Sequence, residues 1–127
     1  MTMIVIVDDD ESVREATESL VMSLGHSVLT FASAEEYLGS GQVSATSCLI
    51  SDLKMPGMSG VELQSRLIAD GHCIPIIFMT AFFEEGTRSR ALRAGALGFL
   101  SKPFELQLLV QCLDKALRSH NAGLAQQ

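Results

Sequence analysis

The feature that most constrains this fold is a fivefold alternation between short apolar runs and segments with helical periodicity. Each run is too short for a helix and is bounded by turn-forming residues, which is typical of strands buried on both faces of a sheet. Strands that alternate with helices predict an α/β fold, a doubly wound five-stranded parallel sheet with helices on both faces and right-handed crossovers. The predicted strands cover residues 3–7, 27–31, 48–52, 75–79 and 96–100.

Polar residues next to the apolar stripes predict where three of the helices begin. Asp10 is expected to cap the first helix, since one acidic residue of the run that follows the first strand is enough for that task. Ser33 is expected to cap a short second helix, with Glu36 completing a capping box. A third helix is expected to begin near Ser59, after a loop rich in proline and glycine.

The last helix is predicted over residues 105–118, where apolar residues recur at helical spacing. This periodicity is lost after Ser119. We therefore expect residues 1–119 to form one domain and residues 120–127 to be a tail or the start of a linker. A chain of 127 residues suits a single domain with its own core, and no internal repeat is present.

The composition excludes several classes of function. The formal net charge is −6, with no basic run, so that a polyanion such as DNA would be repelled overall. No apolar segment approaches the roughly 20 residues of a membrane span, and we expect a cytoplasmic protein that does not bind membranes. Cys48, Cys73 and Cys112 lack metal-site spacing and are predicted to be buried, reduced thiols, while the three histidines are isolated.

Charged or hydroxyl side chains follow four of the five predicted strands. Asp8 and Asp9 follow the first strand, Asp52 the third, Thr80 the fourth and Lys102 the fifth. Because the carboxyl ends of parallel strands lie at one edge of a sheet, these side chains are expected to meet there. The three carboxylates repel one another and one lysine cannot neutralise them. A hard divalent cation can, and oxygen ligands of this kind suit Mg²⁺.

Carboxylates grouped around Mg²⁺ favour phosphoryl chemistry. Asp52 is the best nucleophile, because the loop that follows it leaves it open to an incoming phosphorus atom and an aspartyl phosphate could form. Asp9 and Asp52 would hold the metal, with Asp8 acting through water, and Lys102 and Thr80 would contact the phosphoryl oxygens. Each residue taken alone also has an ordinary explanation, as a helix cap, a solvated turn charge or a hydrogen bond at a strand end.

Taken together, the motifs resemble the receiver domain of bacterial two-component response regulators, over residues 4–117. They are Val7-Asp8-Asp9, the stretch 52–60, Thr80-Ala81 and Lys102-Pro103-Phe104. The resemblance implies a flavodoxin-like fold with strand order 2-1-3-4-5. It also implies that a histidine kinase phosphorylates Asp52. Mg²⁺ would be held by Asp9, Asp52 and the backbone carbonyl of Lys54, with Asp8 bound through water.

The same resemblance implies a conformational switch. Thr80 would move toward the phosphoryl group while the aromatic side chain of Phe99 turns inward. Related domains often have tyrosine or histidine at this position, so phenylalanine favours a packing switch over a hydrogen-bonded one, and a plain core residue is an equal alternative. The Lys102–Pro103 bond is expected to be cis. Phe82 and Phe83, which follow Thr80, depart from the small or polar residues common there.

The resemblance also implies an output face that mediates dimerisation after phosphorylation. Six residues of the last two helices and the fifth strand could form an exposed, partly apolar face of this kind. Alternatively, two of them, on the last helix, only widen the apolar stripe of that helix. The six residues are Arg88, Leu92, Phe99, Ser101, Leu108 and Cys112.

The leading function is therefore a phosphoacceptor signalling module of the FixJ-like branch, in which DNA is bound only by a separate output domain that these 127 residues do not contain. The resemblance implies no enzyme, only a domain that assists its own phosphorylation and dephosphorylation. A stand-alone or degenerate receiver acting as a binding module is one alternative, although Asp52 and Lys102 are both present. A Mg²⁺-dependent phosphatase of the haloacid-dehalogenase type is another, but Lys54 stands where its second aspartate is expected.

Overall fold

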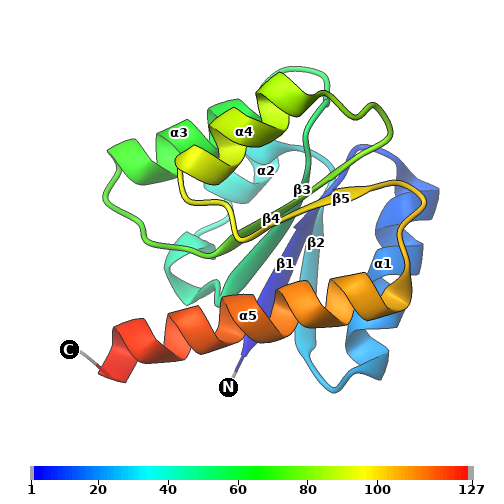
Figure 1. The fold of residues 1–127 in the computed structure, drawn as a ribbon. Coiled ribbons are helices and arrows are strands. Elements are labelled where there is room, and N and C mark those ends of the chain that lie inside the picture. Colours follow the sequence, from blue (N-terminus) through cyan, green and yellow to red (C-terminus); the bar gives the residue numbers. More distant parts are fainter. Residues whose placement is uncertain (1, 126–127) are drawn as a thin grey trace.

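The computed structural model describes the backbone of residues 2–125, which form one parallel sheet between two layers of helices (Figure 1). The strands are β1 Met3–Val7, β2 Ser27–Phe31, β3 Cys48–Asp52, β4 Ile76–Thr80 and β5 Gly98–Ser101. The helices are α1 Glu11–Ser23, α2 Ala34–Leu38, α3 Gly60–Ala69, α4 Glu85–Arg93 and α5 Leu106–Ala125, with a short 3₁₀ helix, η1 Val43–Ala45, before β3. Every predicted strand and helix is therefore present.

All neighbouring strands pair in parallel, in the order β2-β1-β3-β4-β5, so the predicted topology is confirmed. The chain passes from β1 outward to β2 and then returns to the other side of β1 to form β3. This reversal places the carboxyl ends of β1 and β3 side by side, with Val7 opposite Ser51. In open α/β sheets, such a switch point is where ligands bind.

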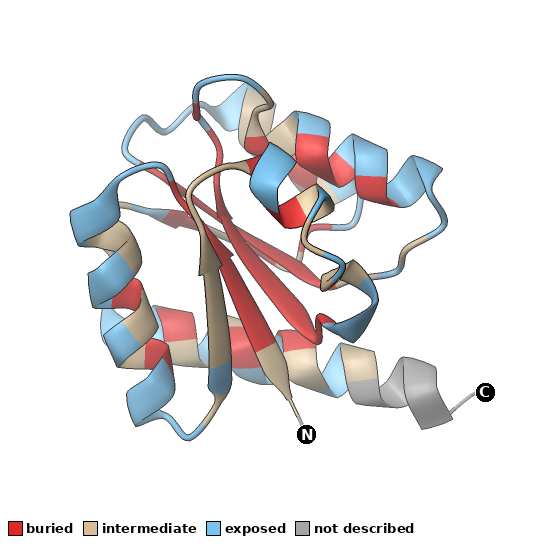
Figure 2. Ribbon diagram, turned by 180° about the vertical axis from the view of Figure 1, so that it is seen from behind, coloured by how far each residue is buried: buried red, intermediate tan, exposed pale blue. Residues whose placement is uncertain are grey.

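The two faces of the sheet carry separate apolar cores, because side chains alternate along each strand. In β1, Val5 and Val7 pack in the first core, which is covered by α2, α3 and α4. Ile4 and Ile6 pack in the second core, which is covered by α1 and α5. Figure 2 shows β1, β3 and β4 almost entirely buried, whereas the edge strand β2 is only half-buried. Burial on both faces explains the continuous apolar runs in the sequence.

The predicted caps are present, with one difference. Asp10 accepts a hydrogen bond from the backbone amide of Val13 at the start of α1. Ser33 likewise accepts from the amide of Glu36, but the Glu36 carboxylate accepts from the amide of Ala32 and not from that of Ser33. The complete capping box is found at the start of α3, between Ser59 and Glu62.

The final helix is longer than the apolar pattern predicts. Its backbone is helical from Leu106 to Ala125, so the expected end at Arg118 is wrong. Once a helix is nucleated, each added residue contributes a further backbone hydrogen bond, and no proline interrupts this segment. The proposed boundary at Ser119 therefore falls inside a continuous helix, and the division of the chain there stays a prediction.

The cysteines do not share one environment. Cys48 is fully buried in β3, and this burial raises the pKa of its thiol to about 12, so it is an unreactive core residue. Cys112 is partly buried on α5, but Cys73 is exposed in the loop before β4, so its predicted burial is wrong. All three are free thiols. Over the described residues, no helix has both the length and the apolar character to cross a bilayer.

Candidate functional site

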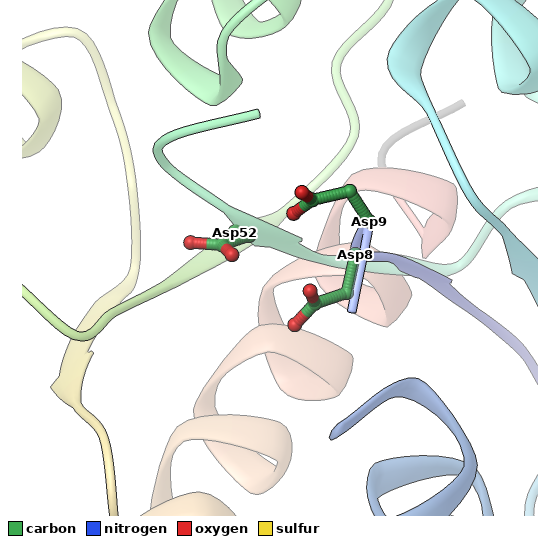
Figure 3. Close-up of side chains that lie close together, drawn as sticks. All are labelled: Asp8, Asp9 and Asp52. Carbon is green, nitrogen blue, oxygen red and sulfur yellow. The ribbon is translucent and has the colours of Figure 1, made fainter. Parts of the chain in front are cut away.

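Three carboxylates meet at the carboxyl edge of the sheet, as predicted. Asp8 and Asp9 come directly after β1, and Asp52 is the last residue of β3 (Figure 3). One carboxylate oxygen from each of the three lies within 4.8 Å of the other two. Asp8 is fully buried and Asp52 is 8% exposed, whereas Asp9 is exposed. Two of the three acids have therefore lost most of their contact with water, which makes their charges costly.

Lys102 joins the two buried acids. Its ammonium group donates to Oδ2 of Asp8 at 2.9 Å and to Oδ2 of Asp52 at 3.0 Å. The side chain of Lys102 is only 15% exposed, so these are ion pairs at the margin of the core and not at the open surface. One ammonium group compensates one of three carboxylates, and the cluster keeps an excess of negative charge.

Asp8 is fixed in place by its neighbours. Its Oδ1 accepts from the backbone amide of Asp10 at 2.9 Å, while its Oδ2 is bound by Lys102. The guanidinium of Arg14 donates to the backbone carbonyl of Asp8 at 2.7 Å. Both carboxylate oxygens of Asp8 are thus already engaged, a geometry compatible with the predicted water-mediated contact to a metal.

The two ionisable partners shift each other's pKa. Burial raises the pKa of Asp52, and the nearby charge of Asp8 raises it further, while the hydrogen bond and charge of Lys102 partly offset this increase. For Lys102, burial lowers the pKa, but hydrogen bonds and charges from Asp8 and Asp52 outweigh that effect and raise it. The folded protein therefore disfavours the ionised form of Asp52 relative to water.

We expect Asp52→Asn to make the domain more stable than the wild type at pH 7. Because the pKa of Asp52 is raised in the folded state, the folded protein binds more protons than the unfolded chain just above the unfolded value of about 3.9. The stabilisation that comes from protonated Asp52 is therefore lost as the pH rises through the folded pKa, and at pH 7 the ionised Asp52 side chain destabilises the fold. Asparagine does not titrate, so urea unfolding at pH 7 and pH 4 should show a gain that shrinks at the lower pH.

The matched control for this change is Asp9→Asn, which neutralises a carboxylate of the same cluster that is exposed to water. Its effect on the free energy of unfolding should be smaller, because water already solvates that charge. An Asp52→Asn variant that is less stable than the wild type at pH 7 would contradict the assigned direction of the shift.

Thr80 lies at the same edge, but its hydroxyl faces the following loop. The side chain is almost fully buried. Its hydroxyl donates to the carbonyl oxygen of Phe82 at 3.1 Å and accepts from the amide of Phe82 at 3.0 Å. Among the described residues the Thr80 hydroxyl has no hydrogen bond to Asp52 or Lys102, although the backbone carbonyl of Thr80 accepts from the amide of Lys102 at 2.7 Å. The structure thus brings Thr80 to the predicted edge, with its hydroxyl bound to the backbone of the β4–α4 loop.

The donor set of the acidic cluster fits a magnesium ion. Carboxylate oxygens from three residues converge within a few ångströms, and hard oxygen donors with room for water are the ligands that Mg²⁺ prefers. The predicted additional ligand, the backbone carbonyl of Lys54, lies two residues after Asp52 in the β3–α3 loop. The side chain of Lys54 is exposed, pairs with Glu84 at 3.7 Å and lies 5.2 Å above the ring of Phe82.

Phe99 occupies β5 at the edge of the sheet and contributes to the first core. Its half-buried ring stands 6.4 Å from the ring of Phe78 and 5.8 Å from that of Phe83, the latter nearly perpendicular. Phe82 and Phe83 are themselves 67% and 52% exposed. An aromatic contact therefore runs from the loop after Thr80 to the predicted switch residue. The Lys102–Pro103 bond is cis, as expected.

The residues of the predicted output face occupy α4, β5 and α5. Ser101 and Leu108 are exposed. Leu92 and Phe99 pack against the first core and Cys112 against the second, so half of the six residues also serve the cores. Arg88 forms an exposed ion pair with Glu85 on the same helix. The role of this face stays a prediction.

Two polar contacts were not predicted from the sequence, one beside the acidic cluster and one between α3 and α4. Arg14 holds the carbonyl of Asp8, as described above. Gln64, which is 3% exposed, donates from α3 to the carbonyl oxygen of Ala91 at 3.1 Å and so fastens the end of α4. Gln64 could have been noticed as a polar residue between Leu63 and Leu67, on the buried face of its helix. For Arg14 the only signal was a cation one helical turn after the acidic run.

The sheet order, together with a lysine-paired acidic cluster at its switch point, defines a signalling domain of the receiver class. The model of the response regulator receiver domain matches residues 4–114 of this chain. The chain therefore belongs to the response regulator receiver domain family, whose members are signalling modules and not typical enzymes.

Curated relatives come from several bacteria. Response regulator protein TodT of Pseudomonas putida is 42% identical over 117 residues, which are 92% of this chain and 52% of TodT. Transcriptional regulatory protein FixJ of Bradyrhizobium diazoefficiens is 34% identical over 115 residues, 91% of this chain and 56% of FixJ. The chain spans about half the length of these relatives. The predicted relationship to FixJ is confirmed.

Solved structures agree with this assignment. The response regulator StyR superposes with a TM-score of 0.92 at 40% identity, over 98% of this chain and 63% of that chain. The structure described as FixJ-N superposes with a TM-score of 0.83 at 32% identity, over 93% of this chain and 94% of that chain. The predicted flavodoxin-like fold class is thereby confirmed.

Proposed function

We propose that this domain accepts a phosphoryl group on Asp52 from a histidine kinase, in a reaction that requires Mg²⁺. The observation that carries the proposal is the position of Asp52, which pairs with Lys102 at 3.0 Å and shares a cation-sized cluster with Asp8 and Asp9. Burial raises the pKa of Asp52, and a carboxylate oxygen that has lost much of its hydration is a stronger nucleophile than a fully solvated one.

In the proposed step, a carboxylate oxygen of Asp52 forms a bond to the phosphorus atom, and the bond from phosphorus to the donor breaks. The donor nitrogen or oxygen leaves with that electron pair, and the product is an acyl phosphate. The ammonium group of Lys102 is near enough to Asp52 to bind an oxygen of the transferred group. Buried backbone and side-chain contacts hold Asp8 and Lys102 in place before the reaction, so little reorganisation is needed.

A magnesium ion bound here would be held by Asp9, Asp52 and the carbonyl of Lys54, with Asp8 contributing through water. It would neutralise charge that develops on the phosphoryl group. The excess of carboxylates over ammonium groups supports this assignment, because a second cation is needed before an anionic donor can approach the cluster.

Phosphorylation is proposed to act through Thr80 and Phe99. The hydroxyl of Thr80 would leave the backbone of Phe82 and bind the phosphoryl group, and the loop that it releases touches Phe99 through Phe83. The face formed by α4, β5 and α5 would then change its preference for partners, including a second copy of the domain. Relatives named as transcriptional regulators suggest an output domain that controls transcription and alone contacts DNA. Such a protein is expected to act in the cytoplasm.

The test is the intact mass of the protein after incubation with acetyl phosphate, with and without Mg²⁺. We expect one phosphoryl adduct that requires Mg²⁺ in the wild type and no adduct in Asp52→Asn, because asparagine lacks the nucleophilic oxygen. Phosphotransfer from a cognate histidine kinase should show the same dependence. An Asp52→Asn protein labelled at the wild-type rate would refute the proposal.

The same samples distinguish the alternatives. A degenerate binding module would give no adduct with either donor, although its fold is intact. A phosphatase would turn over small phosphate esters many times per molecule, whereas a phosphoacceptor gives one adduct that hydrolyses. Release of phosphate from such esters, measured beside the mass spectra, therefore separates an enzyme from a signalling domain.

A further inference from the structure

Glu35, on α2, makes a contact that the acidic cluster does not explain. Although α2 is distant in sequence from the β3–α3 loop, the Glu35 carboxylate accepts from the backbone amide of Met58 at 3.0 Å. The same carboxylate fills the space beside Gly57, where a Cβ atom would overlap its Oε2. Gly57 has φ of +77°, which favours glycine. The loop and the carboxylate are therefore fitted to each other.

This loop carries Lys54. The backbone carbonyl of Lys54 is the predicted metal ligand besides the carboxylates. The two ends of the loop are held by the core: Leu53 and Met55 are buried, and the amide of Gly60 donates to the carbonyl of Leu53 at 2.8 Å. At the tip of the loop, Pro56 and Gly57 are exposed, whereas the side chain of Met58 is partly buried against the first core. Among the described residues, the one hydrogen bond between this tip and a side chain is that from the amide of Met58 to the carboxylate of Glu35.

We propose that Glu35 is a positioning residue for the phosphoacceptor loop. By holding the amide of Met58, it limits the movement of the loop and so keeps the Lys54 carbonyl in place to complete the Mg²⁺ ligand set. This inference rests on the proposed function of the acidic cluster. Outer-sphere contacts that orient a ligand commonly change metal affinity, even though they never touch the ion. No sequence pattern marks Glu35, which stands beside the capping residue Glu36 as one of two consecutive glutamates.

The test compares Glu35→Ala, Glu35→Gln and Glu36→Ala. In the metal-free protein, we expect hydrogen exchange at the Met58 amide to rise in Glu35→Ala and to stay near the wild-type rate in Glu35→Gln, whose amide oxygen still accepts. A Mg²⁺ titration followed by amide spectra should then show an affinity about tenfold lower in Glu35→Ala, the lower end of the range found when an outer-sphere contact that orients a metal ligand is removed. Recovery of most of this loss is expected in Glu35→Gln.

Glu36→Ala is the matched control, since it removes a neighbouring carboxylate that only caps α2 through the amide of Ala32. It should lower stability without changing Mg²⁺ affinity. Equal losses of Mg²⁺ affinity in Glu35→Ala and Glu36→Ala, or unchanged exchange at Met58 in Glu35→Ala, would overturn the positioning role. A wild-type protein that binds no Mg²⁺ and forms no adduct would instead overturn the proposed function, so the two failures are distinguishable.

Discussion

Gly60→Ala is expected to lower the free energy of unfolding by about 3 kcal/mol, within the range found when an interior site is overpacked. A Cβ atom at Gly60 would overlap the carbonyl oxygen of Asp52, and it would stand 3.0 Å from Cε1 of Phe78 and 3.1 Å from Cα of Leu53. Two of these neighbours are backbone atoms, which cannot turn aside as a flexible side chain can. Relief would require α3 to move away from the end of β3. Urea denaturation measures the loss.

Gly86→Ala provides the matched control. Gly86 lies in α4, and a Cβ atom there would meet nothing within 4 Å. Alanine is favoured over glycine in helices, so this change should stabilise the domain by about 0.5–1 kcal/mol. Equal effects of the two substitutions would contradict the argument from close backbone approach. Since the displaced carbonyl belongs to Asp52, Gly60→Ala should also slow labelling with acetyl phosphate.

Lys102→Met is expected to cost about 2–4 kcal/mol at pH 7, because it leaves two buried carboxylates without their cation. Methionine keeps most of the aliphatic volume, so the loss reports charge more than packing. Removing Lys102 also removes the influence that lowers the pKa of Asp52, which should therefore rise further. The stability of the variant should fall more steeply than that of the wild type as the pH rises above about 4. Urea denaturation at several pH values would check this.

Lys54→Met is the control for the lysine experiment. Its ammonium group pairs with Glu84 at 3.7 Å, but both side chains are more than half exposed, and the expected cost is below about 0.5 kcal/mol at any pH.

The Lys102→Met variant should still be labelled by acetyl phosphate, but labelling should no longer promote dimerisation. This expectation assumes that the contact of Lys102 with the phosphoryl group is needed for the response, and a Lys102→Met protein that dimerises on labelling as the wild type does would contradict it.

The position of the acidic cluster could be predicted from the sequence because it depends only on chain order. Asp8, Asp52 and Lys102 each follow an apolar run, and a parallel sheet brings the ends of such runs to one edge whatever the loops do. Burial on both faces made the runs continuous and therefore easy to detect. The same argument predicts that Thr80, at the end of the fourth strand, lies at this edge of the sheet.

What could not be predicted depends on loop geometry and on contacts between distant segments. The direction of the Thr80 hydroxyl follows from the backbone of Phe82, and the contact of Glu35 follows from a turn at Gly57 that has no signature on α2. Apolar periodicity also failed to find the end of α5, because a helical backbone can continue past the point where the apolar pattern in the sequence stops. Apolar spacing is the signal that predicts a helix from the sequence, and it cannot detect a helical backbone in a segment that lacks this spacing.

In the proposed switch, the pair of hydrogen bonds between Thr80 and the backbone of Phe82 sets how completely the unphosphorylated domain is switched off. If each bond contributes about 1 kcal/mol, releasing the hydroxyl costs about 2 kcal/mol in the absence of a phosphoryl group. Such a gap leaves roughly 3% of unphosphorylated molecules in the released arrangement at any moment. The resting domain would then have a low basal output, and substitutions that weaken this hydroxyl contact would raise it without any kinase.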